Sequence, residues 1–184
     1  MQYAHGGDIY TYKNLLDFSI NVNPLGPADA VVEAAARSLQ RIGEYPDSQS
    51  RELRNALAEK KGLAAEQFVI GNGAADLLFS LVLAEKPQKA MIVIPAFSEY
   101  EQALKTVGCE ILYHEVKKEN NFRLGTDLTE KITSELDFLF LCSPSNPAGQ
   151  AVEKEFLIKI AEKCEKERVR LVLDECFVQF LTSG

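Results

Sequence analysis

Short apolar runs alternate with longer amphipathic stretches through most of this chain. Such alternation of strand-like and helix-like segments is typical of a parallel β-sheet covered by helices. Three of the runs are almost continuously apolar, as expected for strands whose two faces are both covered. The pattern therefore predicts an α/β fold of three layers, with helices on both sides of a mostly parallel sheet. The expected strands are residues 67–70, 90–94, 110–116, 137–142 and 169–174.

Amphipathic segments with recognisable ends lie between the expected strands. Residues 74–86 follow a Gly-Asn-Gly turn. Residues 98–108 begin with a capping box from Ser98 to Glu101 and close on Gly108. The same reasoning predicts helices at residues 27–43, 50–62 and 152–168, and a surface loop at residues 117–126.

Composition and organisation indicate a globular protein without a linker between complete domains. The 184 residues are 46% hydrophobic and 26% charged, which is enough apolar material for one sizeable core. Residues 1–44 read as an N-terminal arm and helix, and residues 45–184 as the α/β body.

The charge balance and the absence of long apolar runs narrow the classes of partner. A net charge of -7 and a pI near 5.0 give no general attraction for nucleic acid or anionic membranes. No apolar run approaches the ~20 residues needed to span a bilayer, and the N-terminus lacks a signal pattern. We therefore expect a cytoplasmic protein that binds neither nucleic acid nor membrane.

The cysteines indicate reduced thiols and no metal site. None of the four stands in a C-x-x-C arrangement, and three lie within apolar helix or strand patterns. The spacing therefore predicts core thiols. The four are Cys109, Cys142, Cys164 and Cys176.

The carboxyl ends of the strands carry the unusual residues, and in an open parallel sheet this edge is where ligands bind. The sequence GNGAAD follows the first expected strand, and its glycines allow a tight turn into a helix whose free N–H groups attract an anion. An ordinary strand-to-helix turn is the alternative. Neither a Walker loop nor the dinucleotide fingerprint fits, because the Lys-Ser or Lys-Thr pair is missing and Asp76 stands where Gly or Ala belongs.

The expected strands at residues 90–94 and 137–142 are followed by an aromatic side chain and an amide side chain, respectively. In PAFSEYE, Phe97 can stack on a planar heterocycle, or it can be an ordinary core phenylalanine. In SPSNPAG, two prolines restrict the residues before them, so the amide of Asn146 is held rigidly for a directed hydrogen bond. A proline-rich turn is the simpler interpretation of that stretch.

Asp174 ends the last expected strand, after the apolar residues 171–173 that should be buried. A carboxylate there costs several kcal/mol unless it is paired or hydrogen bonded. Asp174 is therefore expected to face a cation. Helix capping is the alternative role.

Taken in order, GNGAAD, PAFSEYE, SPSNPAGQ and LDECFVQF resemble the fold-type I pyridoxal-phosphate enzymes, in the branch of histidinol-phosphate aminotransferases and threonine-phosphate decarboxylases. The resemblance extends over nearly the whole body of the chain. It implies the large domain of that fold, incomplete here, with pyridoxal 5'-phosphate as the cofactor. It also implies that Asp174 faces the protonated pyridine nitrogen and keeps the ring an electron sink.

The resemblance implies roles for the other matching residues. Phe97 would stack on the cofactor ring and Asn146 would hydrogen bond its phenolic oxygen. Tyr45 matches a tyrosine that reaches the phosphate bound by the partner subunit, which implies a homodimer. The cofactor phosphate would be surrounded by Gly73, Ala74, Ala75 and Asp76.

Two features favour the decarboxylase branch: a phenylalanine that departs from the aminotransferase pattern, and the N-terminal arm. Phe177 stands where the family's aminotransferases commonly have a tyrosine, which removes a hydrogen bond to the phenolic oxygen. The start, HGGDIYTYKNLLDFSINVNPLG, resembles the decarboxylase arm. The resemblance implies that His5, Gly6 and Asn21 line a site for a small phosphorylated amino acid.

The family's Schiff-base lysine is expected downstream of Gly184, since no lysine present lies in the matching context. The chain then corresponds to the N-terminal part of an enzyme and is expected to be inactive alone. The preferred parent is a lyase that decarboxylates L-threonine O-3-phosphate to an aminopropanol phosphate used in cobalamin assembly. A histidinol-phosphate-type aminotransferase and a non-catalytic fragment are the alternatives.

Overall fold

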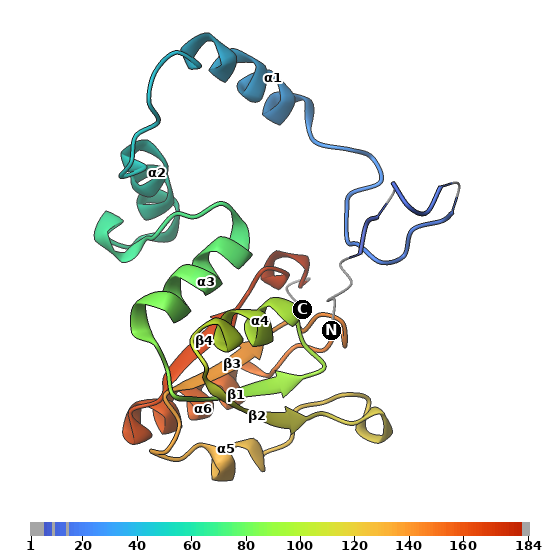
Figure 1. The fold of residues 1–184 in the computed structure, drawn as a ribbon, viewed down its shortest axis with the longest axis vertical. Helices are drawn as coiled ribbons and strands as arrows, with labels where there is room; N and C mark the ends of the chain where they lie inside the picture. Colours follow the sequence, from blue (N-terminus) through green and yellow to red (C-terminus); the bar gives the residue numbers. More distant parts are fainter. Residues whose placement is uncertain (1–5, 9, 14, 182–184) are drawn as a thin grey trace. The chain divides into compact units, whose positions relative to one another are not determined.

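The computed structural model describes residues 6–8, 10–13 and 15–181 of the chain (Figure 1). They divide into two compact units, one up to residue 69 and the other from residue 70. Each unit is described on its own. The division after residue 44 that the sequence indicates remains a prediction about domain organisation.

The first unit consists of two helices and their connections. Helix α1 is Asp29–Ser38, continued by the 3₁₀ helix η1 (Leu39–Arg41), and α2 is Arg51–Lys61, followed by η2 (Ala65–Gln67). Both predicted helices are therefore confirmed. None of the described residues of this unit is buried, so it has no core of its own.

The second unit contains a parallel sheet in the order β2-β1-β3-β4, which confirms the predicted fold class. Every pairing among the described strands is parallel. In the last pairing, Cys142 lies opposite Asp174. The strands are β1 (Lys89–Ile94), β2 (Glu110–Glu115), β3 (Phe138–Cys142) and β4 (Arg170–Asp174).

Helices cover both faces of this sheet. They are α3 (Gly73–Glu85), α4 (Ser98–Thr106), α5 (Leu128–Lys131) and α6 (Lys154–Glu167), with short 3₁₀ helices η3 (Lys118–Asn120) and η4 (Val178–Phe180). Figure 1 shows α3 and α4 on one side of the strands and α5 and α6 on the other.

The alternation of side chains along β1 explains the two cores. Ala90 and Ile92 pack with residues of α3 and α4, whereas Met91 and Val93 pack with residues of α5 and α6. Successive side chains of a strand point to opposite faces, so a continuously apolar strand serves both cores.

Three sequence expectations about elements were wrong. Residues 67–70 form no strand: Gln67 belongs to η2, Phe68 is extended, and Val69 is 78% exposed. The described chain places no strand beside this segment, and an extended run needs a neighbour to accept its hydrogen bonds. The apolar residues of β4 are half-buried, because β4 forms an edge of the described sheet.

The capping box also does not form. Phe97 is the residue before α4, with no side-chain cap, and the Ser98 hydroxyl donates to Glu99 Oε2 at 3.0 Å. The Ser98 hydroxyl is therefore engaged by its neighbour, and the Glu101 carboxylate pairs with Lys105 instead. The end of the helix follows the prediction, since Gly108 is left-handed at φ 71°.

Candidate active site

Asp174 is fixed by two hydrogen-bond donors at the carboxyl edge of the sheet. Tyr100 donates its hydroxyl to Oδ2 at 2.6 Å, and the backbone N–H of Cys176 donates to Oδ1 at 3.0 Å. The side chain is half-buried and occurs in no ion pair of the described residues. Its orientation is thus set by neutral donors, which leaves the negative charge available to a cation.

Tyr100 is the contact of Asp174 that sequence reasoning missed. It is 1% exposed, stacks on Phe140 at 5.4 Å and meets Phe97 edge to face at 5.8 Å. Burial, followed by the Asp174 carboxylate, raises the pKa of its phenol far above the ordinary value. The hydroxyl therefore remains a donor at any physiological pH. The available signal was its i+3 spacing from Phe97, which puts both rings on one face of α4.

Phe97 is itself half-buried and packs against the core between the sheet and α3 and α4. The core contacts that one interpretation of the sequence predicts are therefore present, and stacking on a heterocycle remains a prediction. Phe177, the departure noted above, is half-buried and lies 6.1 Å from Phe180.

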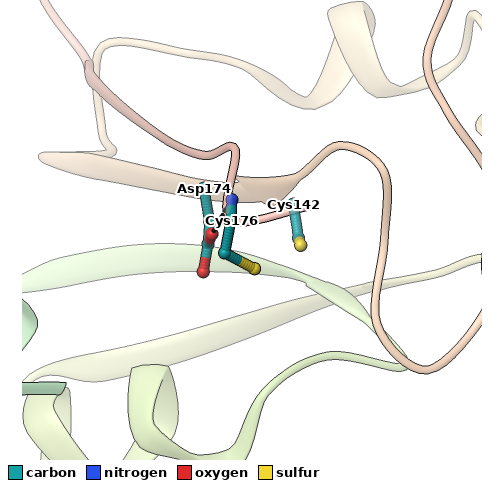
Figure 2. A group of neighbouring side chains, drawn as sticks. All are labelled: Cys142, Asp174 and Cys176. Atoms are coloured by element: carbon teal, nitrogen blue, oxygen red, sulfur yellow. Dashed lines mark hydrogen bonds between the residues drawn. The ribbon is translucent and has the colours of Figure 1, made fainter. Parts of the chain in front are cut away.

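Two thiols lie beside Asp174, as Figure 2 shows. One ligand atom each from Cys142, Asp174 and Cys176 lies within 4.8 Å of the others. Partial burial of its sulfur, and then the hydrogen bond and charge of Asp174, raise the pKa of Cys176 to about 12, although the residue as a whole is exposed. Burial likewise raises the pKa of Cys142. Both thiols are therefore protonated at neutral pH.

The start of α3 is a glycine turn of the kind that binds anions. Gly73 has φ +86°, and a Cβ on Gly71 would lie 2.8 Å from the side chain of Leu77. The first N–H groups of an α-helix have no partner within the helix, so they can donate to a phosphate. The structure gives Asp76 a capping role, because its Oδ2 accepts from the N–H of Asn72 at 2.8 Å.

The loop after β3 is closed by its own hydrogen bonds around Asn146. Ser145 donates its N–H to the carbonyl of Gln150 at 2.8 Å, and Gly149 donates to the carbonyl of Ser145 at 2.8 Å. The peptide bonds before Pro144 and Pro147 are cis. Asn146 is half-buried within this closed turn.

The remaining predicted site residues belong to the first unit. His5 lies outside the described residues. A Cβ on Gly6 would collide with the Ser19 carbonyl, and the neighbouring Gly7 donates its N–H to Ser19 Oγ at 2.9 Å. Asn21 and Tyr45 are exposed. The roles of these residues remain predictions.

Comparison with known proteins identifies the family. The sequence model of the family described as aminotransferase class I and II matches residues 13–184. The chain belongs to this family. It is 38% identical to the threonine-phosphate decarboxylase of Salmonella typhimurium, over 97% of the chain and 51% of that protein. It is 33% identical to the histidinol-phosphate aminotransferase of Methanococcoides burtonii, over 91% of the chain and 46% of that protein.

Solved structures agree with this assignment to the class I and II aminotransferases. The histidinol-phosphate aminotransferase of Clostridium acetobutylicum aligns with a TM-score of 0.78 and 28% identity, over 90% of this chain and 48% of that one. The chain spans about half the length of the curated relatives it matches. Among the described residues no helix is long and apolar enough to cross a membrane.

Enzymes of this aminotransferase family depend on pyridoxal 5'-phosphate, and the residues present fit that cofactor. A half-buried carboxylate held by Tyr100 suits a protonated ring nitrogen, and the open turn at Gly73 suits a phosphate. Tyr100 contacts both Asp174, by a hydrogen bond, and Phe97, by an edge-to-face ring contact.

Proposed function

We propose that this chain is the N-terminal part of a pyridoxal-phosphate lyase that decarboxylates L-threonine O-3-phosphate to aminopropanol phosphate in cobalamin assembly. The 38% identity to the Salmonella threonine-phosphate decarboxylase, over 97% of the chain, is the observation that carries the proposal. Phe177 supports it, because the phenylalanine lacks the hydroxyl that the aminotransferases of this branch commonly present.

In this proposal the described residues bind and orient the cofactor. When bound, the pyridinium ring withdraws electrons from the substrate's Cα. Asp174 holds the ring nitrogen protonated, and Tyr100 fixes the direction of that carboxylate. Phe97 stacks on the ring and Asn146 donates to its phenolic oxygen. The phosphate is surrounded by the first turn of α3 and bound by its backbone N–H groups, at Gly73, Ala74, Ala75 and Asp76.

In the same proposal, residues of the first unit contribute to the substrate site and to contact with a second subunit. His5, Gly6 and Asn21 line the pocket for the phosphorylated amino acid. Tyr45 reaches the phosphate bound by a second subunit of a homodimer, and its complete exposure in this chain is compatible with that role. The four free thiols agree with a cytoplasmic location.

The deciding assay uses the whole parent protein, because this chain spans about half the length of its relatives. Carbon dioxide release from L-threonine O-3-phosphate, without transfer of its amino group, is the expected result. Asp174→Asn in the same protein should reduce turnover by about 100-fold or more, because the ring nitrogen loses its anionic partner. Transamination of histidinol phosphate without decarboxylation would overturn the proposal.

A histidinol-phosphate-type aminotransferase is the second candidate, favoured by the 33% identity to the Methanococcoides enzyme. The same assay separates the two activities. The third candidate, a non-catalytic fragment, is tested on the chain itself. Its intact mass after incubation with pyridoxal phosphate and borohydride should show no site-specific adduct if the lysine lies elsewhere.

A further inference from the structure

We infer that Cys142, Asp174 and Cys176 form a binding site for a thiophilic divalent cation, with zinc as the biological candidate. Two thiolates and a carboxylate are a donor set that zinc accepts in proteins, with a fourth position left to water. The spacing of the cysteines in the sequence indicates no metal site. The site arises because the fold brings the end of β3, with Cys142, beside the end of β4 and the segment that follows it, with Asp174 and Cys176.

The geometry requires only small movements of the side chains. Two sulfurs, each about 2.3 Å from one tetrahedral zinc ion, lie roughly 3.8 Å apart. The three donor atoms here already lie within 4.8 Å of one another. The ladder between β3 and β4 sets Cys142 opposite Asp174, so the backbone fixes two of the three positions.

The hydrogen bonds of Asp174 orient the carboxylate for a ligand. Tyr100 occupies one direction of Oδ2 at 2.6 Å, and the N–H of Cys176 occupies one direction of Oδ1 at 3.0 Å. Each carboxylate oxygen has a second lone-pair direction, which a metal can use. Ligating carboxylates in metal sites are commonly held by such neighbouring donors.

The electrostatics of the cluster also favour a cation. Three anionic donor atoms within 4.8 Å of one another would repel one another. A dication removes that repulsion. As it binds, each thiol releases its proton to water, so one divalent ion replaces two protons. Cys176 is exposed, which gives the ion a route from solvent.

The site has a consequence that rests on the proposed function. If Asp174 pairs with the cofactor's ring nitrogen, the carboxylate serves either the cofactor or the metal. Metal binding should then compete with pyridoxal phosphate. The existence of the metal site does not depend on this competition.

The test is a titration of the purified, phosphine-reduced protein with Co²⁺, followed by the thiolate-to-metal charge-transfer absorption. One equivalent should bind with that band. Cys142→Ser and Cys176→Ser should each weaken binding by about tenfold or more, because each removes a ligand. Cys109→Ser is the matched control, since this thiol lies outside the cluster and should leave binding unchanged. Absence of the band, or an equal loss in the control, would overturn the site.

Addition of pyridoxal phosphate then tests the overlap separately. If both ligands use Asp174, adding pyridoxal phosphate should lower the apparent affinity for Co²⁺. Pyridoxal at the same concentration, which lacks the phosphate group, should not lower it. Unchanged Co²⁺ affinity in a protein that binds the cofactor would overturn the overlap. Failure of pyridoxal phosphate to bind in the parent protein would instead contradict the proposed function, while the metal band would still support the site.

Discussion

The hydroxyl of Tyr100 and the carboxylate of Asp174 show what one hydrogen bond contributes to this site. The phenol is almost fully buried, and its donor reaches an acceptor 74 residues further along the chain. Asp174 could be identified from the sequence, because a carboxylate after a buried run needs a partner. The i+3 spacing from Phe97 brings the ring of Tyr100 beside that of Phe97, but it does not show which strand end its hydroxyl meets.

Tyr100→Phe should therefore lower the free energy of unfolding by about 1 to 2 kcal/mol, because a half-buried carboxylate loses one of its two donors. Urea unfolding followed by circular dichroism would measure the change. Tyr10→Phe serves as the control, because that ring is 85% exposed and its replacement should have no effect. Equal midpoints for Tyr100→Phe and the unmodified protein would contradict the contribution assigned to this bond.

At the level of elements, sequence patterns predicted the helices better than the details at their ends. The 3.6-residue periodicity identified α6, whose buried residues Ile160 and Cys164 lie on the predicted face, whereas α3 was recognised from the Gly-Asn-Gly turn before it. The capping box failed, because the Ser98 side chain bonds its neighbour instead. Residues 67–70 failed as a strand for a tertiary reason, namely that no strand of the described chain lies beside them.

The start of α3 offers a test of backbone conformation and anion binding together. Gly73→Ala should destabilise the protein by about 1 kcal/mol, because φ +86° is unfavourable for a side chain. If the N–H groups of this turn bind the phosphate, the same change should weaken binding of pyridoxal phosphate. Equilibrium titration and thermal unfolding would measure the two effects.

Gly62→Ala is the matched control for that experiment. Gly62 also has a positive φ, of 67°, and open space around it, but it ends α2. Its replacement should cost similar stability and leave cofactor binding unchanged. A loss of cofactor affinity that is the same in both variants would show that stability, rather than the anion site, accounts for the effect.

For the whole molecule, the distribution of buried residues separates the two units. Both hydrophobic cores lie in the unit from residue 70, and no described residue before it is buried. Limited proteolysis should therefore first cut between residues 15 and 69 and leave a resistant fragment that contains β1 to β4. Mass spectrometry of the early products would locate the cuts. Early cleavage within the strands would contradict this division.

A buried histidine should make the stability of the second unit depend on pH. His114 is 3% exposed, and its Nδ1 lies 3.0 Å from Lys131 Nζ, which also pairs with Asp127 at 3.1 Å. Burial and then the Lys131 charge lower the pKa of the imidazole below its ordinary value of 6.5, whereas Asp127 opposes this. As the pH falls below 6.5, His114 binds a proton in the unfolded chain before it does so in the folded protein. The folded protein therefore loses stability as the pH falls from 6.5 toward the lower pKa of the folded state.

The measurement is urea unfolding between about pH 7.5 and about pH 5.5, compared with His114→Gln. The unmodified protein should lose more stability on acidification than the variant, whose amide does not titrate. His5, the other histidine, is present in both proteins and cancels in the comparison. A pH dependence that is the same in both would exclude His114 as its source.

The sequence by itself determined the fold class, the principal helices and the importance of Asp174, because these follow from local periodicity and from the cost of burying charge. Only the tertiary structure decided which groups surround that carboxylate. Cys142 and Tyr100 come from β3 and α4, and the pairing of β3 with β4 and the packing of α4 on the sheet make them neighbours of Asp174. Spacing along a chain contains no information on such neighbours, because parallel strands are joined through crossovers that hide which ends meet.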